Sequence, residues 1–173
     1  MVASALILHL LDRWERERVP RIPPPEKQKA TVLLVGYADE EFPGKSESGS
    51  YLQVGCNDFL VPTEIPVSSK RLQSVLYALT TYEPDVLLHN AVQQKSLRFI
   101  RIEDRLHLGV YKTIVHMEGD PVFGGICDVP RLKAQLEETL KLYLDPFEIH
   151  LNGSAKRWEC LGNESGTCAF VQE

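Results

Sequence analysis

Hydrophobic residues along the chain alternate between patterns typical of strands and patterns typical of helices. Residues 31–37 (TVLLVGY) are apolar and rich in β-branched side chains, which predicts a buried strand. Residues 59–67 (FLVPTEIPV) also have an extended pattern. Pro62 and Pro66 each lack a backbone N–H, so this strand is expected at a sheet edge or paired on one side only.

A first amphipathic helix is predicted after this strand. Its apolar positions follow the i, i+3, i+4, i+7 spacing of one helix face. They are Leu72, Val75, Leu76 and Leu79. Ser68 and Ser69 offer an N-cap, and Pro84 requires the helix to have ended before it. Residues 87–94 are expected to be a loop or a short turn.

A second amphipathic helix is predicted from Asp128, which is an N-cap candidate. Pro130 would lie in the first turn, where its missing N–H costs no hydrogen bond. The apolar stripe is Leu132, Leu136, Leu140 and Tyr143. Pro146 ends the helix.

The remaining strands are predicted as a hairpin and a final strand. Residues 97–102 and 106–115 are expected to pair across a turn at 103–105. Residues 147–151 (FEIHL) alternate between apolar and polar, and Asn152-Gly153 is a strong turn signal.

This order of elements predicts an α+β fold, a two-layer sandwich in which two helices cover one face of a small, mainly antiparallel sheet. The domain is assigned to residues 30–153. Residues 1–29 form an N-terminal region and residues 154–173 a C-terminal tail without clear periodicity.

The N-terminal region combines a short apolar segment with a proline-rich linker. Residues 3–11 are mostly apolar, but a membrane-spanning helix needs about 20 residues. Leu6, Leu10 and Trp14 recur every four residues and predict an amphipathic helix. Two interpretations remain open: a helix that docks on the domain or on another copy, and the end of a truncated membrane anchor that tethers the domain.

Composition narrows the class of protein. The chain has 173 residues, of which 43% are hydrophobic and 25% charged, as in ordinary globular domains. The net charge is −5, and no cluster of Lys and Arg is interleaved with aromatic residues, so a nucleic-acid partner is not expected. The chain lacks the phosphate-binding, dinucleotide-binding, serine-hydrolase and zinc-protease motifs. No cofactor is predicted.

Three segments, taken in order, resemble the GerMN family. They are residues 54–62 (VGCNDFLVP), 124–136 (GGICDVPRLKAQL) and 148–153 (EIHLNG), and residues 88–91 (LHNA) resemble a further segment of that family. Asn57 departs from the pattern, since a glycine is common there. The last 20 residues correspond to nothing in the family.

The resemblance implies a non-catalytic domain similar to ring-building motifs. GerMN domains lie outside the cytoplasmic membrane, usually behind an N-terminal anchor, in sporulation, spore germination and other envelope lipoproteins. We therefore expect an extracytoplasmic, membrane-associated protein whose partners are other envelope proteins or further copies of itself. Two alternatives are a thiol-redox or cell-wall-acting enzyme using Cys56 and Cys127 or Asp58 and Asp128, and a small-ligand-binding domain.

The four cysteines suit two disulfides and an oxidising compartment, although reduced cysteines in the cytosol fit the composition equally well. Cys56 precedes the predicted strand at 59–67, and Cys127 precedes the second helix. If these loops meet at one end of the sheet, the two cysteines can pair. Cys160 and Cys168 are candidates for a small local loop in the tail.

Asp58, Asp128 and Arg131 are expected to form a charged cluster at the same end. In one interpretation Asp128 caps its helix and Arg131 pairs with Asp58 to hold the two loops together. In the other the cluster forms part of a surface for a ligand or partner, although nothing supplies a nucleophile beside it.

The five histidines lie on separate predicted elements, so no metal site is predicted. They are His9, His89, His107, His116 and His150.

Overall fold

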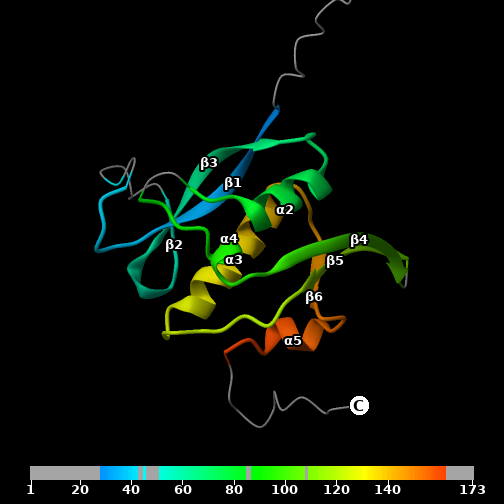
Figure 1. The fold of residues 1–173 in the computed structure, drawn as a ribbon. Coiled ribbons are helices and arrows are strands. Elements are labelled where there is room, and N and C mark those ends of the chain that lie inside the picture. Colours follow the sequence, from blue (N-terminus) through cyan, green and yellow to red (C-terminus); the bar gives the residue numbers. More distant parts are fainter. Residues whose placement is uncertain (1–27, 43–44, 46–50, 85–86, 108, 163–173) are drawn as a thin grey trace, which may run out of the picture.

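The computed structural model describes residues 28–42, 45, 51–84, 87–107 and 109–162 (Figure 1). The predicted N-terminal helix and most of the proposed linker lie outside these residues, as does Cys168. None of the described helices has the length and apolar character needed to cross a bilayer.

The described residues form two three-stranded sheets and four α-helices, and the α+β class is confirmed. In chain order the elements are β1 (Gln28–Gly36), β2 (Leu52–Gln53), the 3-10 turn η2 (Gly55–Asn57), β3 (Phe59–Val67), α2 (Leu72–Thr81), α3 (Ala91–Gln94), β4 (Arg98–His107), β5 (Val110–Glu118), α4 (Asp128–Lys141), β6 (Phe147–Leu151) and α5 (Ala155–Glu159). One sheet has the order β1-β3-β2 and the other β4-β5-β6.

Strand β3 pairs along its whole length with β1 in antiparallel register, from Phe59 opposite Gly36 to Val67 opposite Gln28. Strand β2 pairs only with the first two residues of β3. Pro62 and Pro66 therefore pair on one side only, as predicted from their missing N–H groups.

The free edge of β1 is covered by groups from other elements. Leu33 N donates to Oγ1 of Thr139 at 3.0 Å, and the Tyr143 hydroxyl donates to Thr31 O at 2.6 Å. The backbone N–H and C=O of Val35 exchange hydrogen bonds with those of His89 at 2.9 and 2.7 Å. These contacts satisfy outward backbone groups of Thr31, Leu33 and Val35 and hinder the pairing of this part of the strand with another chain.

The second sheet combines an antiparallel and a parallel pair. Strands β4 and β5 form the predicted hairpin, and β6 lies parallel to β5. The turn was predicted at the wrong place: residues 103–105 belong to β4, and the chain reverses near Gly109, which has φ +80°. The charged run that resembled a turn is a strand segment in which Glu103 bonds Arg101 at 2.9 Å and Arg105 at 2.5 Å.

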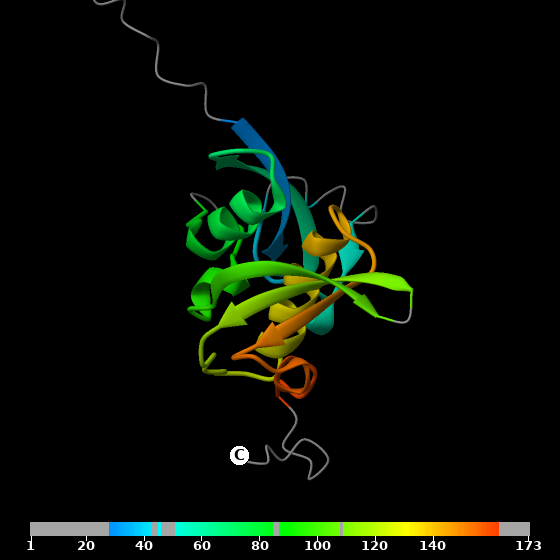
Figure 2. The ribbon, with the colours of Figure 1, turned by 90° about the vertical axis from the view of Figure 1, so that its right-hand side faces the viewer.

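The two sheets and the helices share one hydrophobic core (Figures 1 and 2). Helix α2 contributes the buried residues Val75, Leu76 and Leu79, and α4 contributes Leu132, Leu136 and Leu140. These are the apolar stripes predicted from the spacing. The two-layer arrangement is consistent with the prediction, but the single expected sheet is divided into two.

Two features of the helices differ from the predictions. Helix α2 begins after Arg71, and the hydroxyls of Ser68 and Ser69 both contact that of Ser74 instead of capping a backbone N–H of the helix. The segment expected to be a loop contains α3, which is capped by Asn90 through a bond from Gln93 N at 3.3 Å.

The assigned tail also contains structure. Ser154 caps the short helix α5, whose Trp158 is buried with 4% of its surface exposed. Residues 154–162 therefore continue the folded domain.

Candidate functional site

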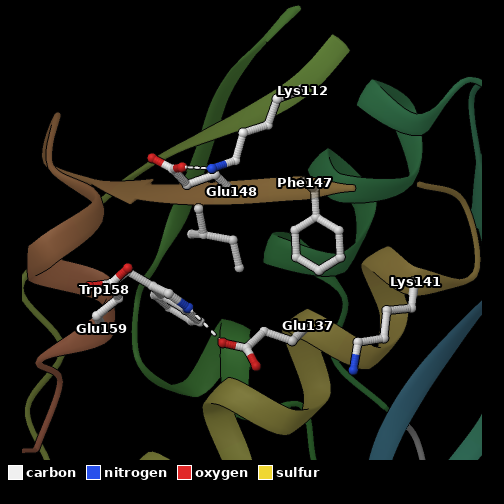
Figure 3. A pocket seen from close by; sticks show the side chains of 8 residues that line it. Lys112, Glu137, Lys141, Phe147, Glu148, Trp158 and Glu159 are labelled. Atoms are coloured by element: carbon white, nitrogen blue, oxygen red, sulfur yellow. Dashed lines mark hydrogen bonds and ion pairs between the residues drawn. The ribbon is translucent and has the colours of Figure 1, made fainter. Parts of the chain in front are cut away.

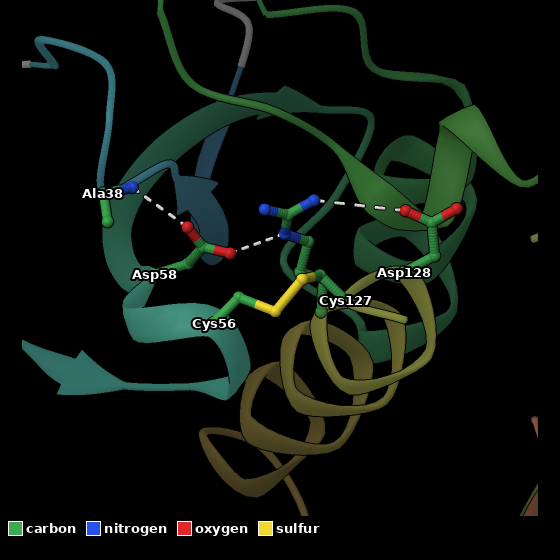
Figure 4. The surroundings of a disulfide bond; sticks show 6 residues. Ala38, Cys56, Asp58, Cys127 and Asp128 are labelled. Carbon is green, nitrogen blue, oxygen red and sulfur yellow. Dashed lines mark hydrogen bonds and ion pairs between the residues drawn. A yellow bond between two sulfur atoms is a disulfide. The ribbon is translucent and has the colours of Figure 1, made fainter. Parts of the chain in front are cut away.

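A disulfide joins Cys56 and Cys127, which are 71 residues apart in sequence (Figure 4). Their Cα atoms are 5.8 Å apart. The pairing of these two loops, expected if they met at one end of the molecule, is confirmed. In this state neither sulfur is a thiol, so a redox reaction through Cys56 or Cys127 would first require reduction of the bond.

The η2 turn takes a backbone conformation that brings Cys56 to the start of α4. Cys56 and Asn57 have φ values of 67° and 61°, in the left-handed region that most residues avoid. A Cβ atom at Gly55 would lie 2.5 Å from Cβ of Pro130, so only glycine permits this close approach. The turn is therefore packed on the first turn of α4 as well as bonded to it.

The buried Asp58 and the partly buried Arg131 form an ion pair beside the disulfide. Arg131 Nε donates to one carboxylate oxygen of Asp58 at 2.5 Å, and Ala38 N donates to the other at 2.9 Å (Figure 4). Burial works against the charge of Arg131, but the hydrogen bond and the negative charge of Asp58 outweigh it and raise the pKa of Arg131. The predicted pair is present and connects the end of β1, η2 and α4.

The predicted N-cap at Asp128 is wrong. Asp128 is the first residue of α4 and Cys127 is its N-cap residue. The Asp128 carboxylate instead accepts hydrogen bonds from Gly124 N at 2.8 Å and from Lys95 Nζ at 2.6 Å. These contacts, led by the hydrogen bond from Lys95, hold the pKa of Asp128 below its usual value. The carboxylate therefore fixes the preceding loop rather than the first turn of the helix.

Four further members of the cluster were not predicted, namely Tyr37, Glu40, His89 and Lys95. The rings of Tyr37 and His89 stack with centroids 3.7 Å apart, and the Arg131 guanidinium carbon lies 4.1 Å from the Tyr37 centroid. His89 Nε2 lies 2.6 Å from a carboxylate oxygen of Glu40. Burial raises the pKa of Tyr37, with Arg131 acting in the opposite direction. Lys95 directly follows α3 and His89 lies two residues before it, and no periodic pattern in the sequence predicts that short helix.

The loop before α4 carries two aliphatic side chains that are almost fully exposed. Val122 is 82% exposed and Ile126 is 92% exposed. The loop backbone is nevertheless held in place, since Val122 O accepts from Lys95 Nζ at 3.0 Å and Cys127 is in the disulfide. The aliphatic side chains thus project from a fixed backbone.

The remaining predicted residues lie apart from this end. Cys160 is buried and disulfide-bonded. His107 and His116 lie on the two strands of the hairpin, and the ring of His116 contacts that of His150, with centroids 5.4 Å apart. Each of these two imidazoles bonds a glutamate: His116 bonds Glu103 at 3.1 Å, and His150 bonds Glu148 at 2.5 Å. Within the described part of the chain, no group of three or more His, Cys, Asp or Glu side chains is arranged to hold a metal ion.

The charged groups of the disulfide end are engaged with one another, an arrangement suited to holding three loops in a fixed geometry. Asp58 bonds Arg131, Asp128 bonds Lys95, and Glu40 bonds His89.

The chain matches no known protein family, no curated protein and no solved structure.

Proposed function

We propose that this protein is a non-catalytic contact module of the GerMN type, which associates with other proteins or with further copies of itself in the bacterial envelope. The proposal begins from the resemblance of three ordered segments to that family. Two of these segments contain Cys56 and Cys127, and their disulfide fits an oxidising compartment outside the cytoplasm.

The observation that carries the proposal is the loop with Val122 and Ile126. Val122 is 82% exposed and Ile126 is 92% exposed, so a partner that covers these side chains removes apolar surface from water, which favours binding. Their backbone is already fixed by Lys95 and by the disulfide, so little conformational entropy is lost on binding. These are the properties of an anchor at a protein interface.

The charged cluster supports this assignment through its role in the fold. Asp58 is 1% exposed and its carboxylate contacts Ala38 and Arg131, which leaves it poorly placed to meet a substrate. Asp128 is turned towards Lys95 and Gly124. The Asp128 carboxylate positions the loop that carries the aliphatic side chains, and the Asp58 carboxylate holds Arg131 of α4; both are structural tasks.

Sedimentation velocity over a wide concentration range tests the proposal. We expect the full chain to show concentration-dependent association and Ile126→Asp to weaken it, because burying a carboxylate at the contact is unfavourable. Tyr77→Asp is the matched control, since Tyr77 is 65% exposed on α2, outside the loop.

Two results together would contradict the proposal. The chain would sediment as a strict monomer at every concentration, and crosslinking in envelope extracts would yield no partner whose capture is reduced by Ile126→Asp. Equal effects of the two substitutions would show that the loop is not the contact.

A further inference from the structure

One edge of strand β6 presents unpaired backbone groups. Thr113 N bonds Pro146 O at 3.4 Å and Asn152 N bonds Met117 O at 2.9 Å, so the even-numbered residues of β6 point their backbone groups at β5. The N–H and C=O of Phe147 and Ile149 must then point away from β5. Within the described residues these four groups have no hydrogen-bond partner.

The next outward residue along the strand, Leu151, differs from them. Its N–H and C=O bond the backbone of Ser154 at 3.0 and 3.1 Å, where the chain turns into α5. The available edge is therefore short, and it comprises Phe147 and Ile149.

A hollow of about 310 Å³ lies against this edge, between β6, α4 and α5 (Figure 3). Phe147, Ile149 and Trp158 supply its apolar walls. The Trp158 indole N–H is already bonded to Glu137 at 2.8 Å, so that wall is fixed. Lys141 lies near the Phe147 end of the hollow and Glu159 near the Trp158 end (Figure 3).

Parts of the other sheet edges are blocked to an added strand in different ways. Outward groups of Thr31, Leu33 and Val35 in β1 are bonded to Tyr143, Thr139 and His89. Since residues 31, 33 and 35 of β1 face away from β3, the register places Pro62 and Pro66 on the outer edge of β3, where they have no N–H to donate. Helix α2 lies beside the first half of β4 (Figures 1 and 2).

We propose that the β6 edge binds an extended peptide segment of a partner protein, which adds to the sheet beside β6. Unpaired backbone donors and acceptors on a strand are matched by the backbone of another extended chain. An aliphatic or aromatic side chain of that peptide enters the hollow between Phe147 and Trp158. Lys141 is already paired with Glu138, whereas the exposed Glu159 favours a basic residue of the peptide at the Trp158 end.

This inference deepens the proposed function, on which it rests, by naming a second surface and the kind of partner it accepts. The two surfaces can fail separately. Loss of association through Ile126 would leave the β6 edge untouched, and an inert β6 edge would leave the Ile126 contact in place.

The test is a titration of the ¹⁵N-labelled full chain with the peptide acetyl-Asp-Val-Ile-Val-Lys-amide, followed by amide NMR. We expect the amides of Phe147 and Ile149 to shift and to gain protection from hydrogen exchange. The amides of Glu148 and His150, which already point at β5, should change several-fold less. The same peptide N-methylated on its central residue should lose most of the effect, because it cannot donate to the strand.

Two variants test the edge. Ile149→Pro removes the outward N–H without removing a bond to β5, although it also removes a core side chain, and in the folded variant we expect about a tenfold loss of peptide affinity. Glu64→Pro makes the same change on the outer edge of β3, where the register points the N–H of Glu64 away from β1, and should leave peptide binding unchanged. If Ile149→Pro does not fold, the N-methylated peptide decides the question with the unmodified protein.

The proposal is overturned if Phe147 and Ile149 do not respond, or if odd and even residues of β6 respond alike. It is also overturned if these two amides are already protected in the free chain, since another segment of the same chain would then occupy the edge.

Discussion

Arg131 reaches back across 73 residues of sequence to bond Asp58, with Nε 2.5 Å from a carboxylate oxygen and only 2% of the Asp58 side chain exposed. The same guanidinium lies over the ring of Tyr37. Arg131 of α4 thus contacts both Asp58, which directly precedes β3, and Tyr37, which directly follows β1. The geometry of the disulfide end depends on this contact as well as on the covalent bond.

Replacement of Arg131 should therefore be strongly destabilising. Arg131→Ala leaves the Asp58 carboxylate buried without its cation, which typically costs about 3–5 kcal/mol. Urea unfolding at neutral pH measures the loss. Arg98→Ala is the control, because the Arg98 side chain is 75% exposed and its 3.4 Å contact with Glu118 should contribute less than about 1 kcal/mol. Similar losses for the two variants would show that the buried pair has no special role.

Removal of the Cys56–Cys127 disulfide should lower the free energy of unfolding by about 4 kcal/mol, because the bond closes a long loop in the unfolded chain. The double variant Cys56→Ser with Cys127→Ser measures this effect in urea without disturbing Cys160. Relief of the left-handed conformation at Cys56 would offset part of the loss. A change below about 1 kcal/mol would mean that the ion pair and the Gly55–Pro130 contact alone fix the two loops.

Sequence patterns predicted the elements whose signal is local. The bounds of β3 and β6 agree with the predicted ranges, and the apolar stripe of α4 is the predicted one. The disulfide was predicted from the placement of Cys56 and Cys127 before a strand and a helix. The signals for the strands and the helix depend on residues close together in the chain, whereas the disulfide joins residues 71 apart and was expected only if their loops met.

Several other features that depend on distant partners were not predicted. Nothing in residues 147–151 indicates that they pair parallel to β5, because alternation is the same in both directions. Helices α3 and α5 are too short to show helical periodicity, and each is identified by its capping residue, Asn90 or Ser154. The stack of Tyr37 on His89 arises only when the segment before α3 bridges to β1.

The stability of the protein should depend on Lys95 in a pH-dependent manner. The pKa of Asp128 is lowered in the folded state, first by its hydrogen bond from Lys95. Because the pKa of Asp128 is lower in the folded state, its stabilisation is fully present at pH values above the pKa of an unfolded Asp, about 3.9. The stabilisation is lost as the pH falls through the pKa of Asp128 in the folded state. We expect Lys95→Met to be less stable than the unmodified chain at neutral pH, with the difference shrinking in acid. A difference that is constant with pH would contradict this assignment.

Trp158 tests whether residues 154–162 are an integral part of the domain. Its side chain is 4% exposed, and its indole N–H bonds Glu137 of α4 at 2.8 Å. Trp158→Ala should cost about 3–5 kcal/mol in urea unfolding, as expected for a large buried aromatic side chain. Trp158→Phe keeps much of the apolar contact but leaves the Glu137 carboxylate without its donor. Its loss in free energy of unfolding should therefore be smaller, about 1–3 kcal/mol. If both variants unfold at the same urea concentration as the unmodified chain, α5 is peripheral, and the hollow beside β6 loses the wall that Trp158 supplies.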